Sequence, residues 1–234
     1  MNPTSFVRGL AAIALDNVFN PYADTCAIYD KDDAAATRRK NLRTYLGAAQ
    51  AMGIDTIWMG RDLGYRGGRR TGLALTDEHH LVELQKMFPG ATFSRATHGS
   101  AVAERTAAEI WAALRAVSRP PLFWNVFPFH PHERGSSLTN RRFTARELAV
   151  VDDLNASLIA WLGVKRIISI GQDASKYAKR FGVEVQIVRH PSYGGVADFR
   201  RGIAEVYGHR SVHNDCSERQ ECLFATSHQQ ACQV

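Results

Sequence analysis

Cysteine is scarce in this sequence of 234 residues. Three of the four cysteines, Cys216, Cys222 and Cys232, come after Gly208, and the five and nine residues between them match no zinc or iron–sulfur pattern. Only Cys26 remains in the rest of the chain, which excludes a disulfide framework there. We therefore expect no metal, no other cofactor, and a reducing compartment such as the cytoplasm.

Long apolar runs are also missing. No stretch of about 18 apolar residues occurs, so we expect no membrane-spanning helix. The apolar stretch 6–19 is short and only Arg8 precedes its apolar run, which favours an N-terminal core helix over a targeting peptide. With 45% hydrophobic residues, the chain can bury one sizeable core or two small ones. We expect one domain over residues 1–208 and a polar, disordered tail over 209–234.

Three common functional motifs are absent as well. The chain has no nucleophile-elbow serine or cysteine, no G-x-G-x-x-G and no Gly-Lys-Ser/Thr. Acyl transfer and the usual dinucleotide and P-loop sites are therefore weak hypotheses. The net charge is +6, from 29 Lys and Arg against 23 Asp and Glu. This charge suits a polyanionic partner, although many ordinary enzymes are equally basic.

Four short apolar runs predict buried β-strands. They show no apolar–polar alternation and are rich in β-branched and aromatic residues: TIWMG (56–60), LFWNVF (122–127), RIISIG (166–171) and VQIVRH (185–190). Helical patterns lie between them. This alternation predicts an α/β fold, a three-layer α/β/α sandwich with a central four-stranded parallel sheet.

The helical patterns cover 34–52, 76–88, 100–117, 144–163, 174–182 and 196–208. Thr76 is the expected N-cap of the second pattern. Thr144, with Glu147 three residues later, has the spacing of a capping box.

Polar residues lie at, or just past, the four predicted strand ends: Asp62, Asn125, the Gly171–Gln172 turn and His190. In a parallel sheet these ends share one edge, where ligands bind. Taken singly, Asp62 is typical of a turn, Asn125 of a satisfied buried amide, and His190 of a loop. Together, a carboxylate, an amide and an imidazole beside basic glycine-rich loops suit cleavage of an N-glycosidic bond on a flipped base.

These motifs resemble, in order, those of the uracil-DNA glycosylase superfamily. Residues 60–64 (GRDLG) resemble its Gly-x-Asp-Pro-Tyr motif, and 190–192 (HPS) its His-Pro-Ser motif. Asn125 stands where the family binds uracil, and 171–174 resemble its phosphate-contacting Gly-x-x-Ala turn. The resemblance spans roughly residues 20–208. It indicates an atypical bacterial branch, because the iron–sulfur cysteines of other branches are absent.

The resemblance implies a monofunctional DNA glycosylase, a hydrolase that flips uracil out of DNA and cleaves its N-glycosidic bond. Asp62 would stabilise the sugar cation and orient water, and His190 would donate a hydrogen bond to a uracil oxygen. Asn125 would pair with uracil O4 and N3–H, and Arg61 belongs to the same substrate site. The implied partner is DNA containing uracil, bound by a monomer without a cofactor.

Two substrate-site positions depart from the family pattern. Gly64 stands where the best-known branch has a tyrosine that blocks the methyl group of thymine, and Leu75 where a phenylalanine stacks on uracil. Tyr65 and Phe127 are candidates to replace these side chains, with core packing as the alternative for Phe127. Two other functions therefore stay open: a mismatch-specific glycosylase acting on thymine, hypoxanthine or damaged bases, and a non-catalytic DNA-binding relative.

The glycine-rich loops supply the expected DNA contacts: Arg66, Arg69, Arg70, Gly171, Gln172, Ser192, Tyr193, Gly194 and Gly195. A solvated loop is the alternative for the arginines. The segment HPHE (130–133) could suggest a metal, but two prolines and no third spaced ligand favour a rigid loop.

Overall fold

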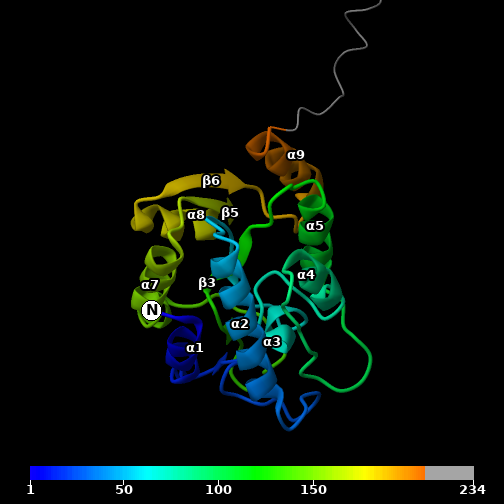
Figure 1. The fold of residues 1–234 in the computed structure, drawn as a ribbon. Helices are drawn as coiled ribbons and strands as arrows, with labels where there is room; N and C mark the ends of the chain where they lie inside the picture. The colour runs from blue at the N-terminus through cyan, green and yellow to red at the C-terminus, as the bar shows by residue number, and fades with distance from the viewer. Residues whose placement is uncertain (209–234) are drawn as a thin grey trace, which may run out of the picture.

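The fold is known from a computed structural model of the chain, which describes residues 1–208. Four parallel strands form the central sheet in the order β3-β2-β5-β6. They are β2 (Thr56–Asp62), β3 (Leu122–Phe127), β5 (Arg166–Ile170) and β6 (Glu184–Val188). Helices lie on both sides of the sheet (Figure 1), so the predicted three-layer α/β fold with a four-stranded parallel sheet is confirmed.

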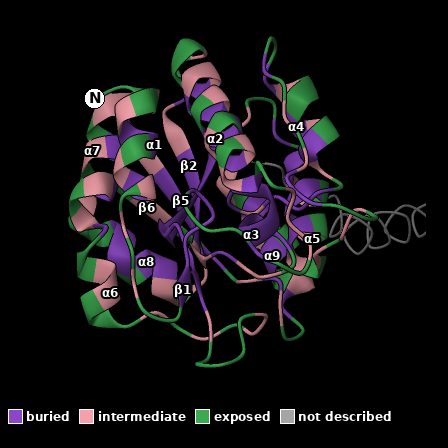
Figure 2. Cartoon of the chain, turned by 90° about the horizontal axis from the view of Figure 1, so that it is seen from below, coloured by how far each residue is buried: buried purple, intermediate pink, exposed green. Residues whose placement is uncertain are grey.

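The helices are α1 (Pro3–Ala11), α2 (Ala34–Ala51), α3 (Gly68–Thr71), α4 (Leu81–Met87), α5 (Arg105–Leu114), α6 (Ala145–Ala149), α7 (Asp152–Leu162), α8 (Gln172–Ala178) and α9 (Val196–Val206), with a 3₁₀ turn at Lys179–Phe181. Figure 2 shows the buried strands between two groups of helices, with α6, α7 and α8 on one side and α3, α5 and α9 on the other. Most residues of the strands β2, β3 and β5 are buried, which explains their continuous apolar sequences. The prediction that the fourth strand is buried is wrong: β6 lies at the edge of the sheet, and only Val188 among its five residues is buried.

The pleat of β2 decides which side chains face which helices. The Trp58 ring contacts Phe199 of α9, so Trp58, Gly60 and Asp62 share the face toward α9 and α5. Arg61 projects to the opposite face, where it meets Asp173 at the start of α8. Neighbouring β3 is in register with this strand, and Asn125 pairs with Gly60. Asn125 therefore projects to the same face as Asp62.

The N-terminal helix is shorter than the predicted segment 6–19. It ends at Ala11, and β1 (Val18–Phe19) pairs with β4 (His130–Pro131) in a small antiparallel sheet that the sequence did not predict. Asn20 explains the early end, because its Nδ2 donates hydrogen bonds to the carbonyls of Leu10 and Ile13, each at 2.8 Å. These bonds hold the chain that follows Ala11 against the end of the helix, where the Leu10 carbonyl also accepts from the Ile13 amide at 3.2 Å.

Two further helix predictions need correction. Thr76 does not cap a helix; its hydroxyl donates to the Ala74 carbonyl, and α4 begins only at Leu81. The helix predicted over 144–163 is two helices, α6 and α7, with a break at residues 150–151. The capping box at Thr144 is confirmed, since Thr144 Oγ1 accepts from the Glu147 amide at 3.2 Å.

Among residues 1–208, no helix has both the length and the apolar character that a bilayer crossing needs. Cys26, the cysteine within this range, is buried and unbridged. The predicted polar tail, 209–234, lies outside the described residues, as do its three cysteines.

Candidate active site at the carboxyl edge of the sheet

Asp62 is the last residue of β2 and is the carboxylate that the sequence predicted at this edge of the sheet. Its side chain is 11% exposed and accepts a hydrogen bond from Arg61 Nε at 2.7 Å. The pKa of the Asp62 carboxyl is raised above its ordinary value, because burial outweighs the hydrogen bond and the charge of Arg61, which lower it. Arg61, predicted as a substrate contact, is therefore also the counter-ion of Asp62.

Asn125 lies beside this carboxylate with an unused hydrogen-bond acceptor. Its side chain packs against Gly60, where a Cβ atom would overlap Asn125 Oδ1 and lie 3.0 Å from Leu75 Cδ2. Glycine at position 60 is what makes room for the amide. Asn125 Oδ1 is buried and accepts no hydrogen bond from the described residues. Because buried polar atoms are nearly always paired, this oxygen is suited to an N–H group of a ligand.

His190 reaches the same edge from the residues that follow β6. Its Nδ1 accepts a hydrogen bond from the Ser192 amide at 3.2 Å, so a neutral ring carries its proton on Nε2. Burial lowers the pKa of His190, and the charge of Arg61 lowers it further. The ring is thus a neutral donor at pH 7. Arg61 influences both His190 and Asp62, which ties these residues to one site.

A carboxylate that sequence reasoning missed lies against the loop between β2 and α3; it belongs to Glu104, the residue before α5. The Glu104 side chain lies against Gly64 and Gly67, and a Cβ atom at either glycine would overlap one of its oxygens. Burial raises the pKa of the Glu104 carboxyl to about 7, the charges of Asp77 and Asp62 also raise it, and Arg66 opposes them. Nothing in the spacing of the sequence connects Glu104 with Asp62, because the pattern over 100–117 assigns it to the interior of a helix.

Two of the three loop arginines turn inward, which contradicts their predicted role in phosphate binding. The Arg69 guanidinium stacks 3.9 Å above the Phe19 ring centroid and lies 3.0 Å from His130 Nδ1. Arg70 Nε donates to Glu78 Oε2 at 2.9 Å. Their exposures are 2% and 6%. The cause is α3, a single helical turn that the sequence did not predict and that directs both side chains into the core. The third arginine, Arg66, is exposed.

The structure also separates the candidates for stacking on a base. Phe127 is fully buried between Phe129 and Phe143, at centroid distances of 5.4 and 5.2 Å, which supports core packing. Leu75 is partly buried next to the Asn125 amide and has a left-handed backbone, with φ of 53°. The Tyr65 side chain is partly buried. Leu75 and Tyr65 remain candidates.

The HPHE segment is structural. His130 is fully buried, and its Nε2 lies 2.8 Å from the Thr139 carbonyl oxygen. Burial and then the Arg69 charge lower the pKa of His130 to about 4. The described residues contain no group of three or more His, Cys, Asp or Glu side chains placed to hold a metal ion.

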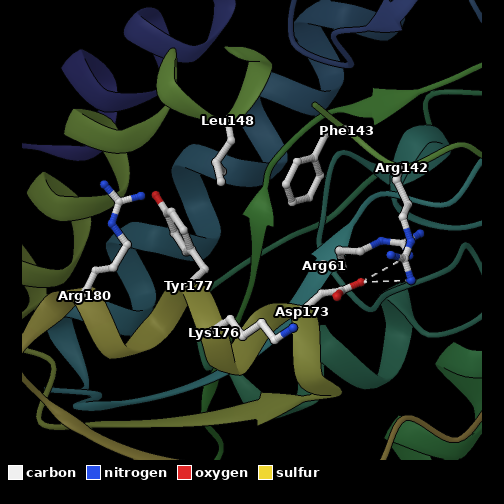
Figure 3. Close-up of a pocket in the computed structure, with 8 residues that line it drawn as sticks. All are labelled: Arg61, Arg142, Phe143, Leu148, Asp173, Lys176, Tyr177 and Arg180. Atoms are coloured by element: carbon white, nitrogen blue, oxygen red, sulfur yellow. Dashed lines mark ion pairs between the residues drawn. The ribbon is translucent and has the colours of Figure 1, made fainter. Parts of the chain in front are cut away.

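Two hollows flank the edge. The first, about 360 Å³, combines the cations Arg61, Arg142 and Lys176 with the Tyr177 and Phe143 rings. Asp173 forms ion pairs with Arg61 at 3.7 Å and with Arg142 at 3.5 Å. Figure 3 shows both guanidinium groups directed toward this carboxylate.

The second hollow, about 450 Å³, lies between the start of α5 and the loop 191–194. Tyr193 in that loop is fully exposed and has φ of 53°, and Gly194 beside it has φ of 76°. Gly195 is buried, and a Cβ atom there would overlap the His190 carbonyl oxygen. Gly171, with φ of 92°, approaches the His190 side chain from β5.

Neither a protein-family model nor a curated protein matches this chain. Among solved structures, the crystal structure of wild-type SMUG2 from Pedobacter heparinus has the same fold, with a TM-score of 0.58. The two chains share 14% sequence identity over 89% of this chain and 96% of the other. At this identity the likeness concerns the fold, so the function must be argued from the residues of the site.

Proposed function

We propose that this protein is a uracil-DNA glycosylase, which flips uracil out of DNA and hydrolyses its N-glycosidic bond to leave an abasic site. The observation that carries the proposal is the convergence of Asp62, the unpaired Asn125 oxygen and the neutral His190 donor at one edge of the sheet. SMUG2, whose fold the chain shares, is a glycosylase of the uracil-DNA glycosylase superfamily. This fold-level analogy supports the proposal without fixing the base.

Asn125 would recognise the base. Its Oδ1 accepts from uracil N3–H and its Nδ2 donates to O4, whereas cytosine presents an acceptor at N3 and a donor at N4. This recognition requires one orientation of the amide, with Oδ1 toward N3–H and Nδ2 toward O4. A fixed orientation lets a single side chain accept uracil and reject cytosine, because the wrong base leaves buried groups unpaired.

Asp62 and His190 would stabilise the two charges that develop as the bond breaks. The sugar becomes cation-like, and the Asp62 carboxylate stabilises it and orients the attacking water. Negative charge spreads over the uracil ring, and Nε2–H of His190 donates to the uracil oxygen that carries it. A neutral imidazole suits this task because it holds the charge by a hydrogen bond and keeps its proton.

The DNA backbone would lie across the same edge. Arg66 is exposed, the Gly171–Gln172 turn and Ser192 lie beside the site, and the Tyr193–Gly195 loop projects from it. Arg142 and Lys176 add exposed cations at the first hollow. We assign phosphate binding to these residues, and the protruding Tyr193 ring to contact with the unstacked duplex. The enzyme would act as a monomer.

A mismatch-specific glycosylase acting on thymine or hypoxanthine is the second candidate function. It rests on Gly64, which carries no side chain to contact a larger base. The two candidates differ in the base they release.

The test incubates the full chain with single- and double-stranded oligonucleotides that contain uracil, thymine or hypoxanthine, followed by alkali. Strand breaks at uracil support the proposal; breaks at thymine of equal rate favour the second function. No break at any base would show a non-catalytic protein. Asp62→Asn and His190→Ala should each lose roughly 10²-fold or more in single-turnover rate. The matched controls are Asp55→Asn, just before the first residue of β2, and His98→Ala, which is exposed. Both should keep wild-type rates.

A further inference from the structure

The Glu104 carboxyl group has no structural task of its own. Glu104 precedes α5, and its main chain does the capping: its amide donates to Asp77 Oδ2 at 2.7 Å, and its carbonyl accepts from the Ala108 amide. The side chain makes no capping hydrogen bond, and within residues 1–208 no hydrogen bond or ion pair to its carboxyl oxygens is formed. Glutamate is not among the preferred N-cap residues. A glutamate at this place therefore needs a reason other than capping.

The position of the carboxyl group supplies that reason. It fills the space into which a side chain at Gly64 would project, since a Cβ atom at Gly64 would overlap Glu104 Oε1 and lie 3.5 Å from Glu104 Cδ. The gap that Gly64 suggests in the sequence is therefore closed by a residue 40 positions further along. The Glu104 carboxyl group therefore lines the part of the site beside Gly64.

Asn125 lies against Gly60 and Glu104 against Gly64, the positions two residues before and two residues after Asp62. Gly60 and Asp62 project from one face of β2, with the Asn125 amide against Gly60; Gly64 follows two residues past Asp62. The helix α5, which Glu104 precedes, packs on that face through the Trp111–Phe123 contact. In the proposed complex, a base held by the Asn125 amide next to Asp62 would have one edge toward the Glu104 carboxyl.

We infer that Glu104 is the specificity-determining residue of the site: its carboxyl group limits the size of the base that can lie beside Gly64 and so excludes thymine. This inference rests on the proposed function. The groups that face Glu104 are Asp62 on β2, Asp77 before α4 and Arg66 on the loop. With its pKa raised to about 7, Glu104 is substantially protonated at neutral pH and then adds no negative charge beside the departing base.

The experiment compares Glu104→Ala, which opens the space, with Glu104→Gln, which keeps the shape and removes the ionisation. Single-turnover excision of uracil and of thymine is measured for both variants and the wild type. Glu104→Ala should raise the ratio of thymine to uracil excision at least about tenfold, since one methyl group in a fitted pocket is worth roughly 10–200-fold. Glu104→Gln should leave the ratio within about threefold of wild type.

A pH profile gives a readout that a merely structural residue would not move. Uracil excision by the wild type should fall as the pH rises through about 7, because the ionised Glu104 carboxylate repels the negative charge on the base. Glu104→Gln should lack this decline, and this variant tests the inference even if Glu104→Ala does not fold.

The outcomes separate the inference from the function. If folded Glu104→Ala excised uracil with an unchanged ratio of thymine to uracil excision, the inference would be overturned and the proposed function would stand. An alkaline decline that persists in Glu104→Gln would also overturn it. No excision of any base by the wild type would overturn both.

Discussion

Asp62 lies between two influences that act on its charge in opposite directions. Burial disfavours the carboxylate, and the Arg61 hydrogen bond at 2.7 Å favours it. Arg61 also lowers the pKa of His190. Arg61 thus opposes the rise in the pKa of Asp62 and lowers the pKa of His190, which favours the carboxylate and the neutral imidazole that the proposed reaction needs.

Arg61→Gln should therefore shift the acidic limb of the pH–rate profile. Without the guanidinium, the pKa of Asp62 rises, so a higher pH is needed to ionise it; the pKa of His190 also rises, so a higher pH is needed to keep it neutral. Both changes move the acidic limb of single-turnover excision to higher pH. Arg180→Gln is the control, because Arg180 pairs with Asp152 away from Asp62. An unchanged limb in Arg61→Gln would contradict this account of Arg61.

The contact of Glu104 with Gly64 should appear as a coupling energy. Gly64→Ala alone should destabilise the fold by about 1–3 kcal/mol in urea denaturation, because the new Cβ atom overlaps the Glu104 carboxyl. In a Glu104→Ala background the same change should cost about zero. Gly47→Ala in α2, whose new Cβ atom would make only an ordinary contact at 3.9 Å with Pro3, is the control and should not couple. If Gly64→Ala lowered the free energy of unfolding equally in both backgrounds, the contact between Glu104 and Gly64 would be refuted.

Glu104 also predicts how stability changes with pH. Its pKa is about 7 in the folded chain and near 4.5 when unfolded, so between these values the folded state binds more protons. The Glu104 contribution is therefore present below pH 4.5 and is lost as the pH rises through about 7. Urea denaturation gives the free energy of unfolding of the wild type and of Glu104→Gln at each pH. The difference between the two should decrease over this interval by about 1–3 kcal/mol. A flat difference would contradict the raised pKa.

At the scale of elements, continuous apolar runs located all four strands; β2, β3 and β5 are largely buried, whereas β6 has one buried residue among its five. β3 was predicted to the residue, and the parallel sheet followed from strand–helix alternation. That alternation also brought Asp62, Asn125 and His190 to one edge. Periodicity could not locate the single turn of α3, which is too short to have a period, so Arg69 and Arg70 were taken for loop residues. Glu104 was missed because its partner glycines lie about 40 residues away and carry no side chains.

Arg70, which α3 buries, should matter for stability, whereas Arg66, exposed on the loop before α3, should matter for DNA binding. Glu78→Gln, which breaks the buried pair with Arg70, should cost about 3–5 kcal/mol of stability in urea denaturation. Arg66→Ala should change the free energy of unfolding by no more than about 0.5 kcal/mol. For DNA binding, it should reduce the magnitude of the slope of log binding constant against log salt concentration by about one. Fluorescence anisotropy at several salt concentrations measures that slope. A large loss of stability in Arg66→Ala would contradict the assignment of Arg66 to the surface.

At the scale of the whole molecule, the fold is shared with SMUG2 at 14% identity, so the sheet and its edge are retained while most side chains differ. The fold places polar groups at the carboxyl edge, and particular residues then decide the chemistry. Asp62 and His190 fit bond cleavage, Asn125 fits the recognition of uracil, and Glu104 closes the space beside Gly64. A net charge of +6 suits a DNA substrate, and binding should weaken steeply as salt increases.

The most direct test of the proposed function is alkali-induced cleavage of an oligonucleotide with one uracil, after incubation with the wild type, Asp62→Asn or Asp55→Asn. The account predicts a break at uracil for the wild type and Asp55→Asn, a rate at least about 10²-fold lower for Asp62→Asn, and no comparable break when thymine replaces uracil. Intact uracil oligonucleotide with the wild type, or full activity in folded Asp62→Asn, would contradict it.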